Sequence, residues 1–188
     1  MFVLVENDSI TKTVSSHKGI TIGENQYPRG IYTLWSAAER EAIGIYEVVL
    51  DNTNRKNQDY YQNTDQSFNF GGGKVTASYG SATAKDLEDI TKNNVVELGL
   101  KTHHKEKIKQ QASTRLAPTD WYVVKATDVD SYSVPDAMTT HRAAVRTASN
   151  DMESKIDACS TVDELAALYV YNDDDPPVRP LGEFPEEV

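Results

Sequence analysis

The chain has 188 residues, of which 38% are hydrophobic and 26% charged, and its formal net charge is −10. This balance is typical of a globular protein with a modest core, and no apolar run approaches the roughly 20 residues that a membrane-spanning helix needs. The acidic excess argues against nucleic acid as a partner, because phosphate binding requires clustered Lys and Arg. The single cysteine, Cys159, excludes an internal disulfide and a cysteine-rich zinc site within one chain.

Strand-like patterns dominate residues 1–84. Alternating or β-branched runs predict strands over 2–5, 9–14, 19–23, 45–50, 59–63, 67–70 and 74–79. Ser36 and Glu39 form a capping box, which predicts a short helix over 37–43. The glycines at 71–73 lead into a predicted strand and not into a helix, so they favour a hairpin connection over a phosphate-binding loop. We therefore expect a small β-rich N-terminal domain.

Helical patterns begin at residue 85. Apolar residues predict an amphipathic helix from 85 to 116, with the stripe Leu87, Ile90, Val95, Leu98, Ile108, Ala112 and Leu116. The stretch 101–107 interrupts this stripe because it has no apolar residue. A helix with such a polar middle is not expected to pack fully against one core, so it would either project from the domain or pair with copies of itself.

Further helices are expected after Pro118, which should end the long helix. A short helix over 120–127 would turn Trp121 and Val124 inward. A helix over 135–158 would keep Arg142, Arg146 and Lys155 outside and bury the stripe Met138, Ala144, Val145, Ala148, Met152 and Ile156. A second capping box, at 161–164, predicts a last helix over 162–169.

The composition changes again at residue 172. The segment 172–188 is acidic and proline-rich, so we expect it either to be mobile or to lie extended along a partner. Together these patterns predict an α+β protein: a β-rich domain over 1–84, a helical region over 85–171 and an acidic tail over 172–188.

A short segment in the helical half resembles a known family. Residues 116–121, Leu-Ala-Pro-Thr-Asp-Trp, and residues 141–146, His-Arg-Ala-Ala-Val-Arg, are similar to the paired segments of phage tail assembly chaperones. The likeness covers about residues 108–146; His141 stands where the family has tyrosine, and Val145 where it has leucine. Arg142 and Arg146 share one helix face, and an antiparallel helix pair would bring Asp120 near one of them, with Trp121 as a core anchor.

The resemblance implies a protein that binds a phage tail or tail-fibre polypeptide and helps it to fold or attach. Such a protein works in the host cytoplasm during assembly, and some members of this kind stay on the virion tail. The alternative is a permanent structural subunit of the tail, such as a fibre adaptor, without chaperone activity. Neither function requires a cofactor, a membrane or nucleic acid, and both allow a homo-oligomer.

Residues that would carry catalysis or bind a metal are not evident. His103 and His104 are adjacent, so on a helix they point about 100° apart and do not share one ion. We therefore expect no enzyme, no metal and no cofactor. Tyrosines favour binding, and Tyr60–Tyr61 is the best candidate, because neighbouring strand residues face opposite ways. The candidate partner-binding residues are Tyr60, Tyr61, Trp121, Arg142 and Arg146.

Overall fold

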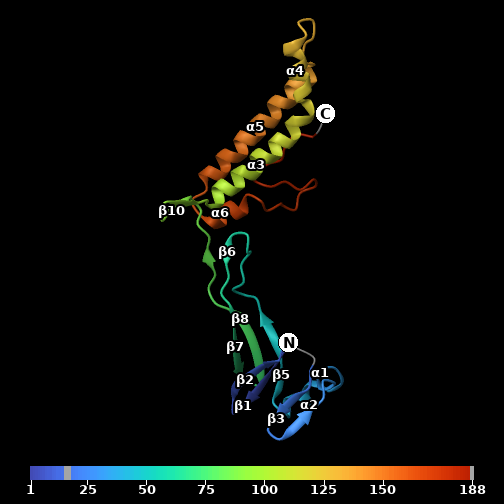
Figure 1. Cartoon of the computed structure of the whole chain (residues 1–188), viewed down its shortest axis with the longest axis vertical. Coiled ribbons are helices and arrows are strands. Elements are labelled where there is room, and N and C mark those ends of the chain that lie inside the picture. The colour runs from blue at the N-terminus through green and yellow to red at the C-terminus, as the bar shows by residue number, and fades with distance from the viewer. Residues whose placement is uncertain (15–17, 187–188) are drawn as a thin grey trace. The chain divides into compact units, whose positions relative to one another are not determined.

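A computed structural model describes residues 1–14 and 18–186. The chain is α+β, as predicted, with strands in its first half and helices in its second (Figure 1). It divides into two compact units, Met1–Thr83 and Ala84–Val188, called unit 1 and unit 2 below.

Unit 1 is built on a five-stranded sheet with the strand order β2-β1-β5-β8-β7. Its strands are β1 (Phe2–Glu6), β2 (Ser9–Val14), β5 (Ile45–Asp51), β7 (Gln66–Gly71) and β8 (Lys74–Tyr79). The sequence predicted all five. β5 pairs antiparallel with β1 through its first residues and parallel with β8 through its last four. The edge strands β2 and β7 approach each other, so the sheet curls.

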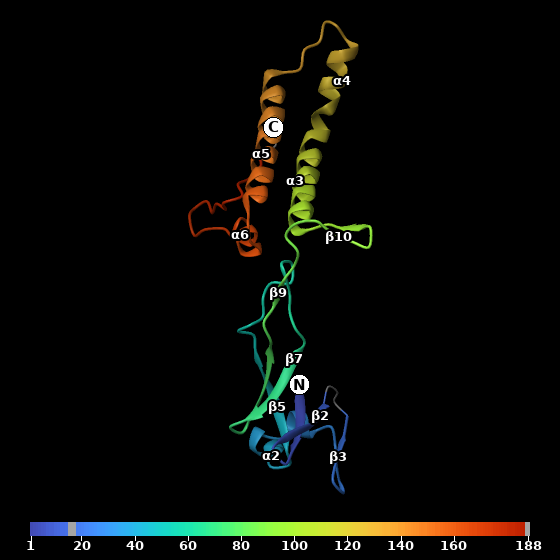
Figure 2. The ribbon, with the colours of Figure 1, turned by 90° about the vertical axis from the view of Figure 1, so that its left-hand side faces the viewer.

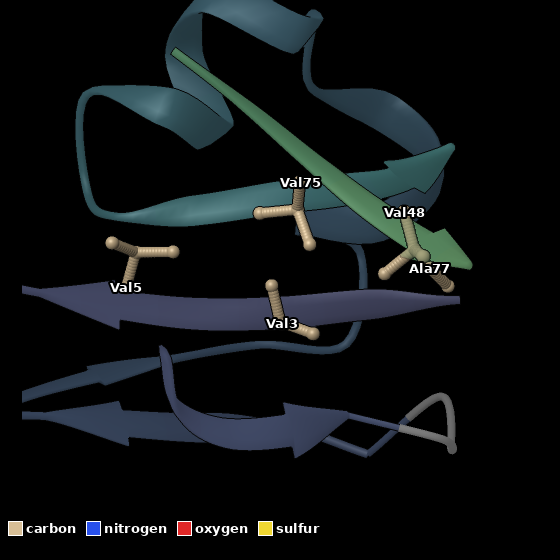
Figure 3. Packing of buried hydrophobic residues seen from close by; sticks show 5 residues of the cluster. All are labelled: Val3, Val5, Val48, Val75 and Ala77. Atoms are coloured by element: carbon tan, nitrogen blue, oxygen red, sulfur yellow. The ribbon is translucent and has the colours of Figure 1, made fainter. Parts of the chain in front are cut away.

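β1 is covered with apolar side chains on both faces, because its residues alternate between two clusters. Val3 and Val5 pack with Val48, Val75 and Ala77 inside the curl (Figure 3). Leu4, which points the other way, belongs to a second cluster with Ile20, Ile31, Tyr32 and Ile45. A strand that is buried on both faces lies at the centre of a core, which explains why β1 is an unbroken apolar run.

Short elements complete unit 1. They are β3 (Ile20–Ile22), β4 (Asn25–Tyr27), α1 (Ile31–Leu34), α2 (Ala37–Glu41), β6 (Tyr61–Gln62) and β9 (Thr83–Ala84). The capping box at Ser36 is confirmed, since its hydroxyl accepts the Glu39 N–H and the Glu39 carboxylate accepts the Ser36 N–H. The expected strand over 59–63 is reduced to the two residues of β6, because a turn occupies the positions before it.

The hairpin predicted at the three glycines is confirmed. Gly72 and Gly73 have φ of 57° and 71°, and Gly71 pairs with Lys74 across the turn. Two successive positive φ values suit the two-residue turn whose twist matches that of antiparallel strands. Glycine adopts these angles without steric cost, which explains the repeat.

Unit 2 begins with a hairpin, where the sequence predicted a helix. β10 (Ile90–Lys92) and β11 (Val95–Glu97) are antiparallel, joined through Asn93 and Asn94 at φ of 52° and 63°. Asparagine tolerates this left-handed conformation, and the pair makes the same kind of turn as the two glycines. The helical stripe expected over 87–98 is therefore wrong.

The first long helix, α3 (Leu100–Leu116), starts at Gly99. The loop before it binds its free N–H groups: Gly99 donates to the Asp89 carboxylate at 2.7 Å, and Leu100 to the Asp86 carbonyl at 2.9 Å. A Cβ atom at Gly99 would overlap the backbone of Glu88. Gly99 therefore allows the close approach of the backbone at Glu88 where the helix begins.

α3 continues through a 3-10 turn, η1 (Ala117–Thr119), into α4 (Asp120–Asp128). α5 (Asp136–Ala158) runs back beside α3, and α6 (Val162–Ala167) follows (Figures 1 and 2). The capping box at Thr161 and Glu164 is confirmed. Cys159 is buried at the end of α5.

α3 and α5 pack as an antiparallel pair. Val145, Met152 and Ile156 are buried as predicted, but Ala144 is exposed and Met138 and Ala148 are only half-buried. Two residues of the polar stretch 101–107, Lys101 and His104, are buried near the start of α3, contrary to expectation, because their polar atoms have partners. The ammonium of Lys101 donates to the Asp157 carbonyl at 3.0 Å and pairs with Glu88. His104 Nδ1 lies 2.7 Å from the Tyr169 hydroxyl.

Residues 172–186 fold back onto the rest of unit 2, whereas the sequence led us to expect a mobile segment or one laid along a partner. Leu181 is 1% exposed, and its N–H donates to the Leu168 carbonyl at 3.0 Å. The acidic part of this segment is a loop over 172–178, and the leucine that follows it, Leu181, is buried.

Candidate protein-binding surface

α4 presents its apolar side chains to solvent. Trp121 is 51% exposed, Val123 41% and Val124 57%. None of the nine residues of α4, all in the described part of the chain, is buried. We call Trp121 and Val124, which lie three residues apart on one face of the helix, the α4 surface, whereas Val123 lies on another face. The prediction that Trp121 and Val124 face inward is wrong.

Pro118 explains the exposure. The sequence led us to expect that this proline ends the helix and lets the chain turn back. Proline lacks an N–H but fits the first turn of a helix, and here it lies inside η1. The chain therefore continues from α3 into α4, which extends past the end of α3 (Figure 2). The α4 surface is left without a helix to cover it.

Arg142 on α5 holds the junction between α3 and α4. Its guanidinium donates to the Leu116 carbonyl at 3.0 Å and to the Thr119 hydroxyl, and it lies 2.8 Å from the Asp120 carboxylate. The expected approach of Asp120 to Arg142 or Arg146 is confirmed for Arg142. The expectation that Arg142 lies outside is wrong: it is buried, because the rigid fork of donors fits the carbonyl, hydroxyl and carboxylate that gather where α3 ends.

Arg146 lies one turn further along α5 and is exposed. It donates to the Arg142 carbonyl at 3.5 Å, at the limit of a hydrogen bond. Arg142 is thus a positioning residue, whereas Arg146 offers a charge at the surface.

Aromatic and cationic groups give the α4 surface its local order. The rings of Trp121 and Tyr122 lie 3.9 Å apart. The ammonium of Lys125 lies 5.6 Å from the Trp121 ring and 4.2 Å from the Tyr132 ring. A cation over an indole face is attracted to it and restricts its rotation. An ordered aromatic side chain loses less entropy when a partner covers it.

The tyrosine pair lies in unit 1. Tyr60 is buried, and burial raises the pKa of its hydroxyl. Tyr61 in β6 is half-buried, with the Lys56 ammonium 4.3 Å from its ring. Tyr61 is the more accessible of the two, but Tyr60 lies in the turn before β6, so the expected alternation of two neighbouring strand residues does not apply.

Sequence reasoning missed other exposed apolar side chains. Val95 and Val96 are exposed on opposite faces of β11, and Leu34 is 83% exposed at the end of α1. Asn93–Asn94 between two β-branched runs was the signal for the hairpin. These side chains are isolated or few, whereas α4 combines a tryptophan, a tyrosine and valines on one short helix.

Within residues 1–14 and 18–186, no three His, Cys, Asp or Glu side chains gather as ion ligands would. His103 pairs with Glu106 at 4.0 Å and His104 with Tyr169, so the adjacent histidines face different partners. No helix in the described ranges has the length and apolar content to cross a bilayer.

Comparisons with protein-family models, with curated proteins and with solved structures give no match to this chain.

Proposed function

We propose that this protein is a non-enzymatic phage tail assembly protein that binds a tail or tail-fibre polypeptide through the α4 surface. The observation that carries the proposal is an exposed tryptophan and an exposed valine on one face of a helix that a buried arginine holds in place.

Exposure of this helix requires an explanation. An isolated nine-residue helix is unstable in water, and most helices in proteins are stabilised by burying an apolar face. α4 buries none, and it depends on the clamp at Arg142 and on continuity with α3. Its composition is that of an interface, since tryptophan, tyrosine and arginine are enriched where proteins bind one another. Covering Trp121 and Val124 with a partner would supply the stabilisation that the free protein lacks.

The class of partner comes from the resemblance of residues 116–121 and 141–146 to tail assembly chaperones. The two segments contain Thr119, Asp120 and Trp121, and Arg142 and Arg146. The first segment supplies Trp121, which contacts the partner, and the junction between α3 and α4. The second segment supplies Arg142, which holds α4 in place. Binding through an apolar surface suits a chaperone, whose client exposes apolar side chains before assembly.

Co-expression tests the proposal. The chain is produced together with the tail or fibre polypeptide encoded beside it, and the soluble yield of that polypeptide is measured. We expect the double variant Trp121→Ser, Val124→Ser to lose most of this yield while the variant itself stays folded. Leu34→Ser is the matched control, because it removes a highly exposed apolar side chain from unit 1. Equal yields with both variants would refute a role of the α4 surface.

Mass spectrometry of purified particles distinguishes the chaperone from a permanent tail subunit. A transient chaperone is absent from finished particles. A fixed number of copies per tail would instead identify a structural subunit.

A further inference from the structure

The segment 178–186 lies on unit 2 as a bound peptide lies on its receptor. It contains no helix or strand in the described range up to residue 186. The Lys155 ammonium donates to two successive carbonyls, of Pro180 at 2.8 Å and of Leu181 at 3.1 Å. The Leu181 N–H donates to the Leu168 carbonyl, and the Leu181 side chain is buried. The segment, drawn in red, returns from α6 beside the α3–α5 pair (Figures 1 and 2).

Further contacts extend this footprint: the Arg179 guanidinium lies 5.7 Å from the Tyr169 ring and 5.4 Å from the Tyr171 ring, and it pairs with Glu183 at 2.7 Å. The Arg115 guanidinium, in the last turn of α3, lies 4.7 Å from the ring of Phe184. The Tyr171 hydroxyl donates to the Glu183 carboxylate at 2.6 Å, and this bond raises the pKa of Tyr171. Recognition thus uses a leucine, a carboxylate two residues later and an aromatic ring three residues later.

Most of these contacts do not depend on the segment being joined to α6. Lys155 and Leu168 bind backbone groups, which any extended chain offers. Tyr171 and Arg115 contact the side chains of Glu183 and Phe184. Main-chain hydrogen bonds for affinity and pockets for spaced side chains are the usual way in which proteins bind extended peptides.

In the loop that joins the segment to α6, charge repulsion opposes closure, whereas hydrogen bonds of Asn172 hold the loop closed. The loop over 172–178 contains three successive aspartates, Asp173, Asp174 and Asp175, whose charges repel one another. Two hydrogen bonds between Asn172 and Val178 close the loop. The Asn172 N–H donates to the Val178 carbonyl at 2.9 Å, and the Asn172 side-chain oxygen accepts the Val178 N–H at 2.8 Å. Beyond it, Leu181 is the one side chain of the segment that is almost wholly buried in the described structure.

We propose that the surface around Lys155, Leu168 and Arg115 is a peptide-binding site, and that residues 178–186 fill it as a built-in competitor. Its external ligand is an extended segment of a partner protein with the same pattern: a leucine, a carboxylate two positions on, and an aromatic residue followed by proline. The site is separate from the α4 surface. A partner that carries this pattern displaces the segment and takes its place.

A labelled synthetic peptide with the sequence of residues 178–186 tests the exchange on the full chain, with fluorescence anisotropy as the readout. The apparent affinity of a site is reduced by the fraction of molecules in which it is open. Leu181→Ser weakens the built-in competitor, so this variant should bind the peptide at least about tenfold more tightly than the unchanged chain. Lys155→Met added to Leu181→Ser should abolish the gain. A peptide with serine in place of its leucine is the matched control.

Hydrogen exchange of the unchanged chain gives a second readout that needs no variant. Excess peptide should accelerate exchange of the Leu181 amide, which is protected by the Leu168 carbonyl, and leave the amides of α5 unaffected. The control peptide should have no effect. The proposal is overturned if the peptide neither binds the Leu181→Ser chain nor accelerates exchange at Leu181. Neither measurement involves a tail polypeptide, so the result does not depend on the function proposed above.

Discussion

Replacing Arg142 by methionine tests the clamp that holds α4. Methionine retains most of the apolar stem but no donor, so the Leu116 carbonyl and the Thr119 hydroxyl lose a partner. Thr119 is buried, and its hydroxyl still donates to the Leu116 carbonyl at 2.8 Å, so each group keeps one partner and loses a hydrogen bond to a charged donor, which contributes about 1.5–3 kcal/mol. The ion pair adds at most about 1 kcal/mol, because the side chain of Asp120 is 59% exposed. We expect Arg142→Met to lower the free energy of unfolding of unit 2 by about 3–5 kcal/mol.

Urea unfolding followed by circular dichroism at the helical wavelength measures this loss. Arg146→Met is the matched control on the same helix: its side chain is exposed and makes one long hydrogen bond, so we expect a change below about 0.5 kcal/mol. Asp120→Asn should cost less than about 1 kcal/mol, because it removes only the exposed half of the ion pair. Equal midpoints for the two arginine variants would show that the buried clamp does not stabilise the junction.

Three other measurements probe different parts of unit 2. Trp121→Ala should change the unfolding free energy by less than about 1 kcal/mol, whereas a loss of about 3–5 kcal/mol would restore the buried placement expected from sequence. Leu181→Ala should cost about 2–5 kcal/mol and Val178→Ala, at an exposed position, almost nothing; if both are neutral, the segment is not docked in solution. Burial raises the pKa of the Cys159 thiol, so less thiolate is present at pH 8 and iodoacetamide should react slowly with the native chain and rapidly in urea. Equal rates in the two conditions would contradict this.

The β-rich half was predictable because its signals are local. Alternation, the capping box at Ser36 and the glycine turn each depend on a few neighbouring residues, and the structure contains all three. What the sequence could not supply is the pairing of distant strands, above all the parallel contact of β5 with β8.

The hairpin over 90–97 was missed because its apolar residues also fit a helical period. Ile90 and Val95 belong to a plausible helical stripe, but Val95 and Val96 are β-branched and follow two asparagines. Turn chemistry at Asn93 and Asn94 outweighed the periodicity.

The candidate site was only partly predictable. The resemblance singled out Trp121, Arg142 and Asp120, and the ion pair between the last two is present. The size and apolar character of Trp121 suggested that it is buried. Its burial depends, however, on whether a later helix packs over it. Pro118 does not turn the chain back, so α4 extends past α3 and Trp121 stays exposed. The burial of Arg142 could not be predicted from the helical periodicity of α5, because it depends on acceptors at the end of a neighbouring helix, the Leu116 carbonyl and the Thr119 hydroxyl.

The place of β8 between β5 and β7 has a consequence for the order in which unit 1 folds. β1, β2 and β5 are synthesised before β8, so β5 must wait with one edge unpaired until residues 74–79 emerge. An open edge rich in valine is a template for wrong pairing between chains. Rapid closure of the β7–β8 hairpin through its two-glycine turn shortens this interval, since the hairpin then docks on β5 in one step. A substitution that slows formation of the turn at Gly72 and Gly73 should therefore lower the yield of folded protein more than it lowers the stability of the folded molecules.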